Sequence, residues 1–524
     1  MAFASVGEAT PLTKLALLNR CYAHLVGLPL PLNHPFRTAV ASGADPISLC
    51  ENLVGKAILD DSTYRTVASD AEAKTILQNF YAFHREWFEG QVFDQMQGYS
   101  MNFGPGTSDL FDSTEPALAL TYNLFAPASL NVPYKAVLQG KLGYYGLREI
   151  DPAVNQKNFA NVPSFLLPAR RYKSYNDDFA GSTMNIKSTA NFQRSERDSS
   201  DYVLMTNPIQ IGELVGVRLD YRVLRIPNYA PSTLKLITPR PAGNFTENAL
   251  QTPGAIASIN VNENQGGGIL GLNSFILINW FHEPGRLQNG AEKMARRWVQ
   301  STFKSLLCRD VPLVRYSDVA DIPTEPNLPE VAAFRKSQSC VQCHATMDPF
   351  AAVGRNFYVA GGDYDYKAGA AGSDASGYAH KVSYVIGRFG VTEQGAVPWS
   401  AKPVVGFHKQ APVGKVFFRT TTGELVDSSV SGVEAAALEL TKQKDIYRCA
   451  AKRYFQHFTG LDVGLYDPGD PANQGALASE DPSVKDMRKF IYEIGDELSQ
   501  HQSLRALIGQ IMKSKWYVDS NYLQ

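Results

Sequence analysis

The sequence contains no long, uninterrupted hydrophobic run. Its most apolar stretch, Gly268–Phe281, is interrupted by Asn273, Ser274 and Asn279, and it is too short to span a lipid bilayer. An A-x-A triplet at residues 2–4 resembles the end of a cleaved leader, but no apolar h-region precedes it. We therefore expect a protein without a transmembrane segment, in a mature or truncated form.

Blocks of lysine or arginine are also missing. The 50 Lys and Arg residues nearly balance the 51 Asp and Glu residues, which gives a net charge of −1. This balance argues against nucleic acid or an anionic membrane surface as the main partner. With 44% hydrophobic and 19% charged residues in a chain of 524, the composition predicts an ordered protein with about two to four domains.

Cysteine is scarce, so disulfide bonds do not dominate the scaffold. Two of the six cysteines lie three residues apart in the motif described below. The other four are Cys21, Cys50, Cys308 and Cys449. Four thiols permit three complete pairings, and the sequence does not choose among them. If the compartment is oxidising, we expect Cys21–Cys50 and Cys308–Cys449; otherwise we expect four buried free thiols.

The spacing of apolar residues divides the chain into four segments. Residues 1–110 form an N-terminal helical region, and residues 111–310 form an irregular, mixed region that ends in a helix. Residues 311–430 contain the cysteine motif, and residues 431–524 form a C-terminal helical domain. We therefore expect a mainly α, multidomain protein with a large irregular or minor-β middle region.

Start and stop signals predict the individual helices. They cover residues 10–27, 46–59, 71–88, 285–307 and 445–460, and two more begin at Asp481-Pro482 and at Ser503. A short strand is predicted within residues 217–226. The Gly- and Ala-rich residues 361–377 predict a surface loop.

Residues 339–344 read Ser-Cys-Val-Gln-Cys-His, which is a C-x-x-C-H haem-attachment pattern. Two thiols three residues apart on a helical turn reach the two vinyl groups on one edge of a porphyrin. The imidazole of the next residue then points at the iron. We therefore predict a cytochrome c-like segment with one covalent haem c, attached to Cys340 and Cys343, with His344 as the proximal iron ligand.

Other chemical interpretations are weaker. A structural zinc site needs two further ligands at close spacing, and the sequence has no second C-x-x-C and no H-x-x-x-H. A redox-active dithiol needs a βαβ context, which the sequence does not predict. The residues Asp467, Asp470 and Asn473 lack the rest of a calcium-binding EF-hand pattern, so a solvated turn is the better interpretation.

The motif does not define the ligand on the other face of the haem. His408 lies far enough downstream for a loop to return over the ring, and His380 is the second choice. Met347 follows His344 too closely to reach the opposite face. Weaker candidates are Met487, Met512, His282 and His457. Two protein ligands favour electron transfer, whereas a single ligand leaves the iron open to peroxide or a diatomic gas.

Beyond the motif, the order of segments resembles the planctomycete-type multidomain cytochromes c, which are bacterial chains of consecutive domains of unknown function. Residues 18–27 resemble the opening helix of that family's large helical domain, and residues 267–308 resemble its closing segment. Residues 340–349, where C-x-x-C-H is followed by x-x-M-D-P, resemble the haem-motif domain. Residues 455–460 and 490–517 are similar to the short C-terminal helical domain.

The chain departs from the family pattern after Pro349. Ala351 stands where the family has glycine, Arg355 where it has glutamate and Tyr358 where it has aspartate, whereas the intervening Asn-Phe pair is retained. The resemblance implies haem c, a helical architecture and export to the periplasm or the outer cell envelope. It supplies no substrate.

We therefore expect an exported monohaem cytochrome that acts in electron transfer. Because a single haem does not conduct along a protein alone, a redox partner protein or a membrane-associated assembly is implied. One alternative is a peroxidase-like haem enzyme with an open iron site. The other is a cell-surface assembly subunit in which the haem is a structural staple.

Overall fold

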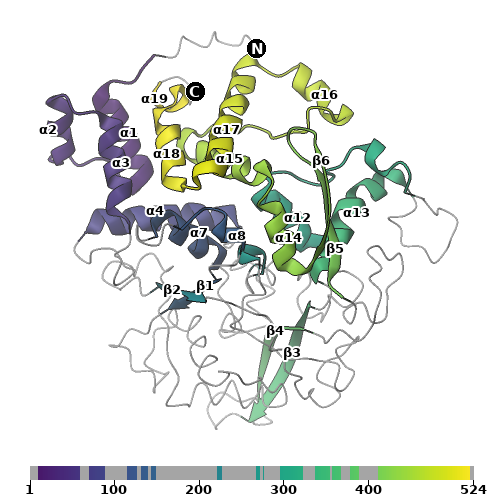
Figure 1. Cartoon of the computed structure of the whole chain (residues 1–524). Coiled ribbons are helices and arrows are strands. Elements are labelled where there is room, and N and C mark those ends of the chain that lie inside the picture. Colours follow the sequence, from purple (N-terminus) through teal and green to yellow (C-terminus); the bar gives the residue numbers. More distant parts are fainter. Residues whose placement is uncertain are drawn as a thin grey trace.

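The computed structural model of the chain is shown in Figure 1. The residues that it describes are 10–58, 70–88, 115–126, 132–139, 143–148, 221–226, 267–271, 275, 296–322, 337–354, 357–367, 378–388 and 411–519. For residues 143–148, 221–226, 357–367 and 378–388, the description is of the backbone. The described residues are mainly helical, as the sequence predicted.

Helices form most of the described chain. The N-terminal helices are α1 (Lys14–Val26), α2 (Pro35–Ala41), α3 (Pro46–Lys56) and α4 (Ala71–Trp87). The middle of the chain contributes α7 (Glu115–Phe125), α8 (Ala136–Gln139), η8 (Gly268–Gly271), α12 (Arg296–Leu306), η9 (Tyr316–Val319), α13 (Gln338–Ala351) and η11 (Ala352–Gly354). The C-terminal helices are α14 (Gly432–Leu440), α15 (Lys444–Thr459), α16 (Pro471–Ala478), α17 (Pro482–His501), α18 (Leu504–Lys513) and α19 (Lys515–Val518). Within the described residues, no helix combines the length and hydrophobicity that crossing a bilayer requires.

The first helix begins later than predicted and ends where predicted. Thr13 caps α1, because its hydroxyl accepts a hydrogen bond from the N–H of Ala16 at 3.2 Å. Pro11, which lies within the predicted helix, instead forms an isolated β-bridge with Asp519 near the other end of the chain. Gly27 ends α1 in the left-handed conformation at φ 74°, which glycine adopts without a Cβ clash.

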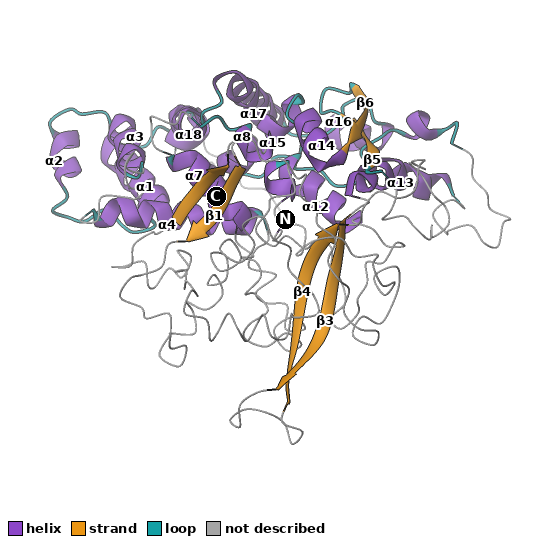
Figure 2. Cartoon of the chain, turned by 60° about the horizontal axis from the view of Figure 1, so that its bottom comes forward, coloured by secondary structure: helices purple, strands orange, loops and turns teal. Residues whose placement is uncertain are grey.

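In the part of the chain that the structure describes, three two-stranded antiparallel sheets accompany the helices. They pair β1 (Gly143–Arg148) with β2 (Tyr221–Ile226), β3 (Phe357–Lys367) with β4 (Tyr378–Arg388), and β5 (Val413–Arg419) with β6 (Leu425–Ser431). Strand β2 falls within the strand predicted over residues 217–226. Figure 2 shows the β3–β4 pair extending away from the layer formed by the helices.

Strand β3 corrects the loop predicted for residues 361–377. Residues 361–367 belong to the strand and pair with β4. The physical reason is the alternation that ends in Tyr364 and Tyr366, because aromatic residues at every second position favour a strand. Two of the glycines that suggested a loop, Gly361 and Gly362, lie earlier in the same strand. The rest of the predicted loop, residues 368–377, lies outside the described residues.

One continuous hydrophobic core joins both ends of the chain. It includes Leu18 in α1, Phe80 in α4, Trp298 in α12, Tyr454 in α15 and Tyr517 in α19, each at most 1% exposed. Burial of a large apolar side chain contributes about 1.5–3 kcal/mol. The four predicted segments contribute to one core, and their boundaries stay a prediction.

Helix α13, which carries the cysteine motif, is held between β5 and α12 by close contacts. The backbone of Gly414 in β5 approaches α13 so closely that a Cβ at this position would overlap the carbonyl oxygen of Pro349. From α12, the rings of Trp298 and Phe303 lie 5.5 and 5.3 Å from the ring of Phe350. The position of α13 therefore depends on packing against segments that are distant in the sequence.

A methyl group at Gly414 tests this packing. Gly414→Ala is expected to lower the free energy of unfolding by about 1–3 kcal/mol, because overpacking forces the strand and the helix apart. Gly475→Ala is the matched control, since Gly475 lies inside α16 and a methyl group there would meet no neighbouring segment within 4 Å. Alanine there is expected to raise the free energy of unfolding by about 0.5–1 kcal/mol. Denaturant unfolding measures both changes, and an unaltered stability of the Gly414→Ala protein would contradict the close contact.

Two partly buried histidines beside the core predict a pH dependence of stability. Burial lowers the pKa of His24 to about 4, with help from the charge of Arg20. Burial also lowers the pKa of His457 to about 4, with help from His24. Because these pKa values lie below the ordinary 6.5, the unfolded chain binds more protons between pH 6.5 and pH 4. The free energy of unfolding therefore falls as the pH drops through this window.

The substitution His457→Phe isolates one of these groups. Phenylalanine retains a ring against Phe83, on which His457 is stacked with a centroid distance of 4.1 Å, and it removes the titrating nitrogen. The loss of stability between pH 6.5 and pH 4 is expected to be smaller in the variant by about 3 kcal/mol. Denaturant unfolding at both pH values measures the difference, and an equal loss in the two proteins would refute a neutral, buried His457.

Candidate functional site

The C-x-x-C-H segment forms the first two turns of α13. The hydroxyl of Ser337 caps this helix by accepting a hydrogen bond from the N–H of Cys340 at 3.3 Å, which satisfies a backbone donor that a helix start leaves open. Residues three and four apart lie on the same side of a helix. Cys340, Cys343 and His344 therefore share one face of α13, and all three are partly exposed.

All six cysteines lie within the described residues, and only the two of the motif are unpaired. Cys21–Cys50 joins α1 to α3, and Cys308–Cys449 joins the end of α12 to α15, with Cα–Cα distances of 6.3 and 5.2 Å. The pairing predicted for an oxidising compartment is confirmed. The two motif thiols are therefore the ones left for other chemistry.

A carboxylate lies between the motif histidine and an arginine of α12. Nδ1 of His344 is 3.2 Å from both carboxylate oxygens of Asp348, one helical turn further along α13. Arg296 donates two hydrogen bonds to the same carboxylate, from Nε at 2.6 Å and from Nη2 at 3.0 Å. A hydrogen bond at Nδ1 favours the imidazole tautomer that carries its proton there and its lone pair on Nε2, which is the nitrogen that then serves a metal.

Electrostatics keep this carboxylate ionised. Burial disfavours the charge of Asp348, but the hydrogen bonds from His344 and Arg296 outweigh it and hold the pKa below its ordinary value. Burial, together with the neighbouring Cys340, raises the pKa of Cys343.

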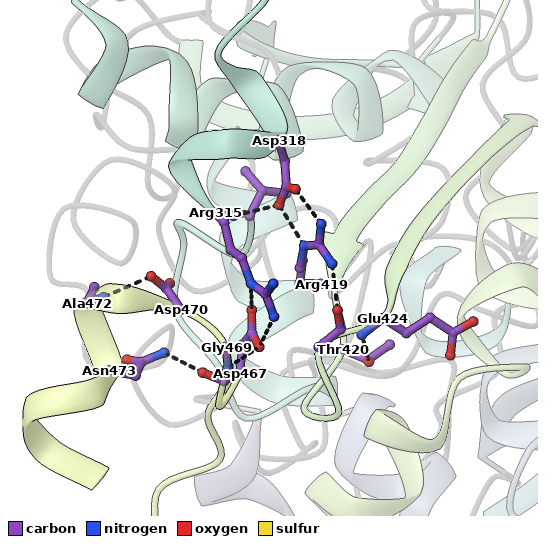
Figure 3. Close-up of polar contacts among 12 residues, drawn as sticks. Arg315, Asp318, Arg419, Thr420, Glu424, Asp467, Gly469, Asp470, Ala472 and Asn473 are labelled. Atoms are coloured by element: carbon purple, nitrogen blue, oxygen red, sulfur yellow. Dashed lines mark hydrogen bonds and ion pairs between the residues drawn. The ribbon is translucent and has the colours of Figure 1, made fainter. Parts of the chain in front are cut away.

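Paired arginines and aspartates brace the segments around α13 (Figure 3). Arg315, at the start of η9, donates to the carboxylate of Asp467 from Nε at 2.7 Å and from Nη2 at 2.8 Å. Arg419, at the end of β5, donates from Nε to Asp318 at 2.8 Å. Since η9 and β5 both pack against α13, these pairs connect the surroundings of the motif helix to the loop before α16.

The residues considered for calcium form a turn. The carboxylate of Asp467 is 2% exposed and is occupied by Arg315, so it is buried rather than solvated. The carboxylate of Asp470 caps α16 by accepting a hydrogen bond from the N–H of Ala472 at 3.0 Å, and Nδ2 of Asn473 donates to the carbonyl oxygen of Asp467 at 3.1 Å. Among the described residues, no three His, Cys, Asp or Glu side chains gather into a metal cluster.

The distal ligand candidates fall into two groups. His408 and His282 lie outside the described residues. His380 lies on β4, and its side chain also lies outside the description. Met347 belongs to α13 itself and lies one turn after Cys343, so it remains on the side of the haem that His344 would occupy.

The remaining candidates lie in the hydrophobic core or beside it. Met487 in α17 is 6% exposed and Met512 in α18 is fully buried. His457 in α15 is stacked on Phe83. The distal ligand therefore stays a prediction, with His408 as the first choice and His380 as the second.

Neither Asp348 nor Arg296 received a role from the sequence. The spacing of four residues between His344 and Asp348 is a local signal for their hydrogen bond, because such residues meet on a helix surface. Arg296 lies 52 residues from Asp348, and no local pattern connects the two.

The donor set of α13 fits haem c. Two unpaired thiols three residues apart suit two thioether bonds, and an imidazole that is hydrogen-bonded at Nδ1 suits iron ligation through Nε2. Cys340, Cys343 and His344 are therefore the residues that would hold the group.

No protein-family model, curated protein or solved structure matches this chain. The resemblance to the planctomycete-type cytochromes therefore stays a prediction. The function has to be inferred from the residues of the site themselves.

Counting thiols tests the pairing of the cysteines. When the chain is exported without haem attachment and unfolded in denaturant, Cys21, Cys50, Cys308 and Cys449 are expected to take no thiol label, and reduction should then expose all six cysteines. Haem-loaded protein is expected to take no label before reduction, because thioether bonds consume both thiols. Mass spectrometry of the labelled peptides measures the result. A label on Cys21 or Cys308 before reduction would contradict the corresponding disulfide.

Proposed function

We propose that this protein is an exported c-type cytochrome with one covalent haem, which transfers electrons to or from a redox partner protein or within a membrane-associated assembly. The observation that carries the proposal is the state of the cysteines. Four of them form disulfides, and the two that remain share one face of α13 with His344. Covalent attachment of haem uses these three groups in this order.

The disulfides support an oxidising compartment. Such bonds persist outside the cytoplasm and are rare within it. Haem c is likewise attached outside the cytoplasm. Both lines of support agree with a location in the periplasm or at the outer cell envelope.

Each residue of the site has a role under this proposal. Cys340 and Cys343 bind the porphyrin edge, and Nε2 of His344 ligates the iron. Asp348 and Arg296 hold the imidazole in one tautomer and one orientation. When bound, the haem supplies a one-electron couple whose potential depends on its ligands, its hydrogen bonds and its burial.

Zinc is less well supported than haem. A structural zinc site uses four ligands. The described part of the chain contains no group of three or more His, Cys, Asp and Glu side chains that would supply them. Haem needs only the three residues that α13 presents.

A pyridine haemochrome spectrum with an intact mass of the natively produced protein tests the proposal. We expect a c-type spectrum and one covalent haem per chain, and we expect Cys340→Ser/Cys343→Ser to lose the covalent haem. The matched control is Cys21→Ser/Cys50→Ser, which also replaces two cysteines, here the pair of a disulfide, and is expected to keep the haem. Colourless native protein with both motif thiols unmodified would rule the proposal out.

Carbon monoxide separates electron transfer from the open-site alternative. With two protein ligands on the iron, the ferrous spectrum is expected to remain unchanged under carbon monoxide, because no position is open. His408→Ala is expected to create carbon monoxide binding if this residue is the distal ligand, and His380→Ala is the parallel test of the second choice. Rapid binding by the unaltered protein would favour a haem enzyme.

A further inference from the structure

We infer that Asp348 is a positioning residue that holds the proximal histidine and lowers the midpoint potential of the haem iron, with Arg296 fixing the carboxylate in place. This inference rests on the proposed haem attachment and deepens it. It concerns a residue of the chain that the C-x-x-C-H motif does not contain. The observation behind it is the ordered contact between an imidazole, a carboxylate and a guanidinium.

Arg296 holds the carboxylate of Asp348 in place, and the carboxylate in turn holds the imidazole of His344. Nε and Nη2 of Arg296 donate to different oxygens of Asp348 at 2.6 and 3.0 Å. Two parallel hydrogen bonds of this kind define the plane of a carboxylate as well as its position. Nδ1 of His344 lies 3.2 Å from each of the two oxygens, so the imidazole faces a rigid acceptor.

The site is also shielded from water. The side chain of Asp348 is 12% exposed, that of His344 is 16% exposed and that of Arg296 is 33% exposed. A hydrogen bond to an ionised carboxylate that is partly shielded from solvent is stronger than the same bond in water. The hydrogen bond between His344 and Asp348 is therefore strong enough to change the basicity of the other imidazole nitrogen, Nε2.

The chemical consequence follows from the charge of the acceptor. A carboxylate attracts the Nδ1 proton more strongly than a neutral carbonyl does, so electron density on the imidazole rises and Nε2 becomes a more basic ligand. A more basic ligand stabilises the oxidised iron more than the reduced iron. The midpoint potential therefore falls, since hydrogen bonding around the ligand is one of the levers that set it.

Redox titration of the haem-loaded Asp348→Asn protein tests the inference. Asparagine keeps a hydrogen-bond acceptor of similar shape and removes the charge. We expect the ratio of reduced to oxidised haem at a given potential to rise about tenfold, which is about 59 mV for one electron. Asp348→Glu, which restores the charge, is expected to recover part of the shift.

Asp318→Asn is the matched control for a merely structural role. Asp318 is also a shielded aspartate in an arginine pair, with a side chain 4% exposed beside Arg419, and it lies outside the motif helix. Its loss is expected to lower stability and to leave the midpoint potential unchanged. Equal potentials in the unaltered protein and in haem-loaded Asp348→Asn would overturn the inference, as would an equal rise in both aspartate variants.

A haem-free measurement separates this inference from the proposed function. In the Cys340→Ser/Cys343→Ser background, nitrogen NMR of His344 is expected to show the proton on Nδ1. Adding Asp348→Ala is expected to shift the proton to Nε2, the tautomer that an isolated imidazole prefers. An unchanged tautomer would overturn the positioning role, whereas native protein without haem would overturn the proposed function.

Discussion

Helix α13 begins at the cap formed by Ser337, and within its first turns it brings Cys340, Cys343 and His344 to one face. The remainder of the site depends on this constraint, because three separate donors become a single attachment surface only while the segment is helical. The helical repeat also brings Asp348, four residues after His344, within hydrogen-bonding distance of the imidazole. A helix therefore supplies both the bonds to a cofactor and the hydrogen bond that controls one of them.

Long-range contacts hold that helix in place. Because Gly414 has no side chain, β5 can approach the backbone of α13 closely. Helix α12 contributes aromatic rings that pack against α13, and it also carries Arg296. The Cys308–Cys449 disulfide ties the end of α12 to α15 in the core. The orientation of Asp348 is thus coupled, through a helix and a covalent link, to the most deeply buried part of the protein.

Local signals predicted half of the α-helices among the described residues, and the failures come both from distant packing and from local turns that were not recognised. Gly27 ended α1, and Asp481 and Ser503 capped α17 and α18 as predicted, because each acts on neighbouring backbone groups. The helix predicted over residues 445–460 begins at Lys444, and the carboxylate of Asp445 is buried against Thr421 in the turn between β5 and β6. Helices α2 and α14 and the β5–β6 pair were missed. Helix α14 packs against η8 and α8, which are distant in the sequence, whereas β5 and β6 form a local hairpin with Gly423 in its turn. The haem-attachment motif can be recognised within residues 339–344 of the sequence. The contact of Asp348 with Arg296 cannot be recognised in this way, because the two residues are far apart in the chain.

The presence of two disulfides beside two unpaired cysteines connects an oxidising compartment with the attachment of haem. A compartment that oxidises Cys21–Cys50 and Cys308–Cys449 also threatens two neighbouring, partly exposed thiols. Thioether formation converts both thiols at once, and the resulting thioether sulfurs do not take part in disulfide exchange. A zinc ion would protect the same thiols only with further ligands. The attachment of haem therefore accounts for the unpaired cysteines and for the histidine beside them with a single event.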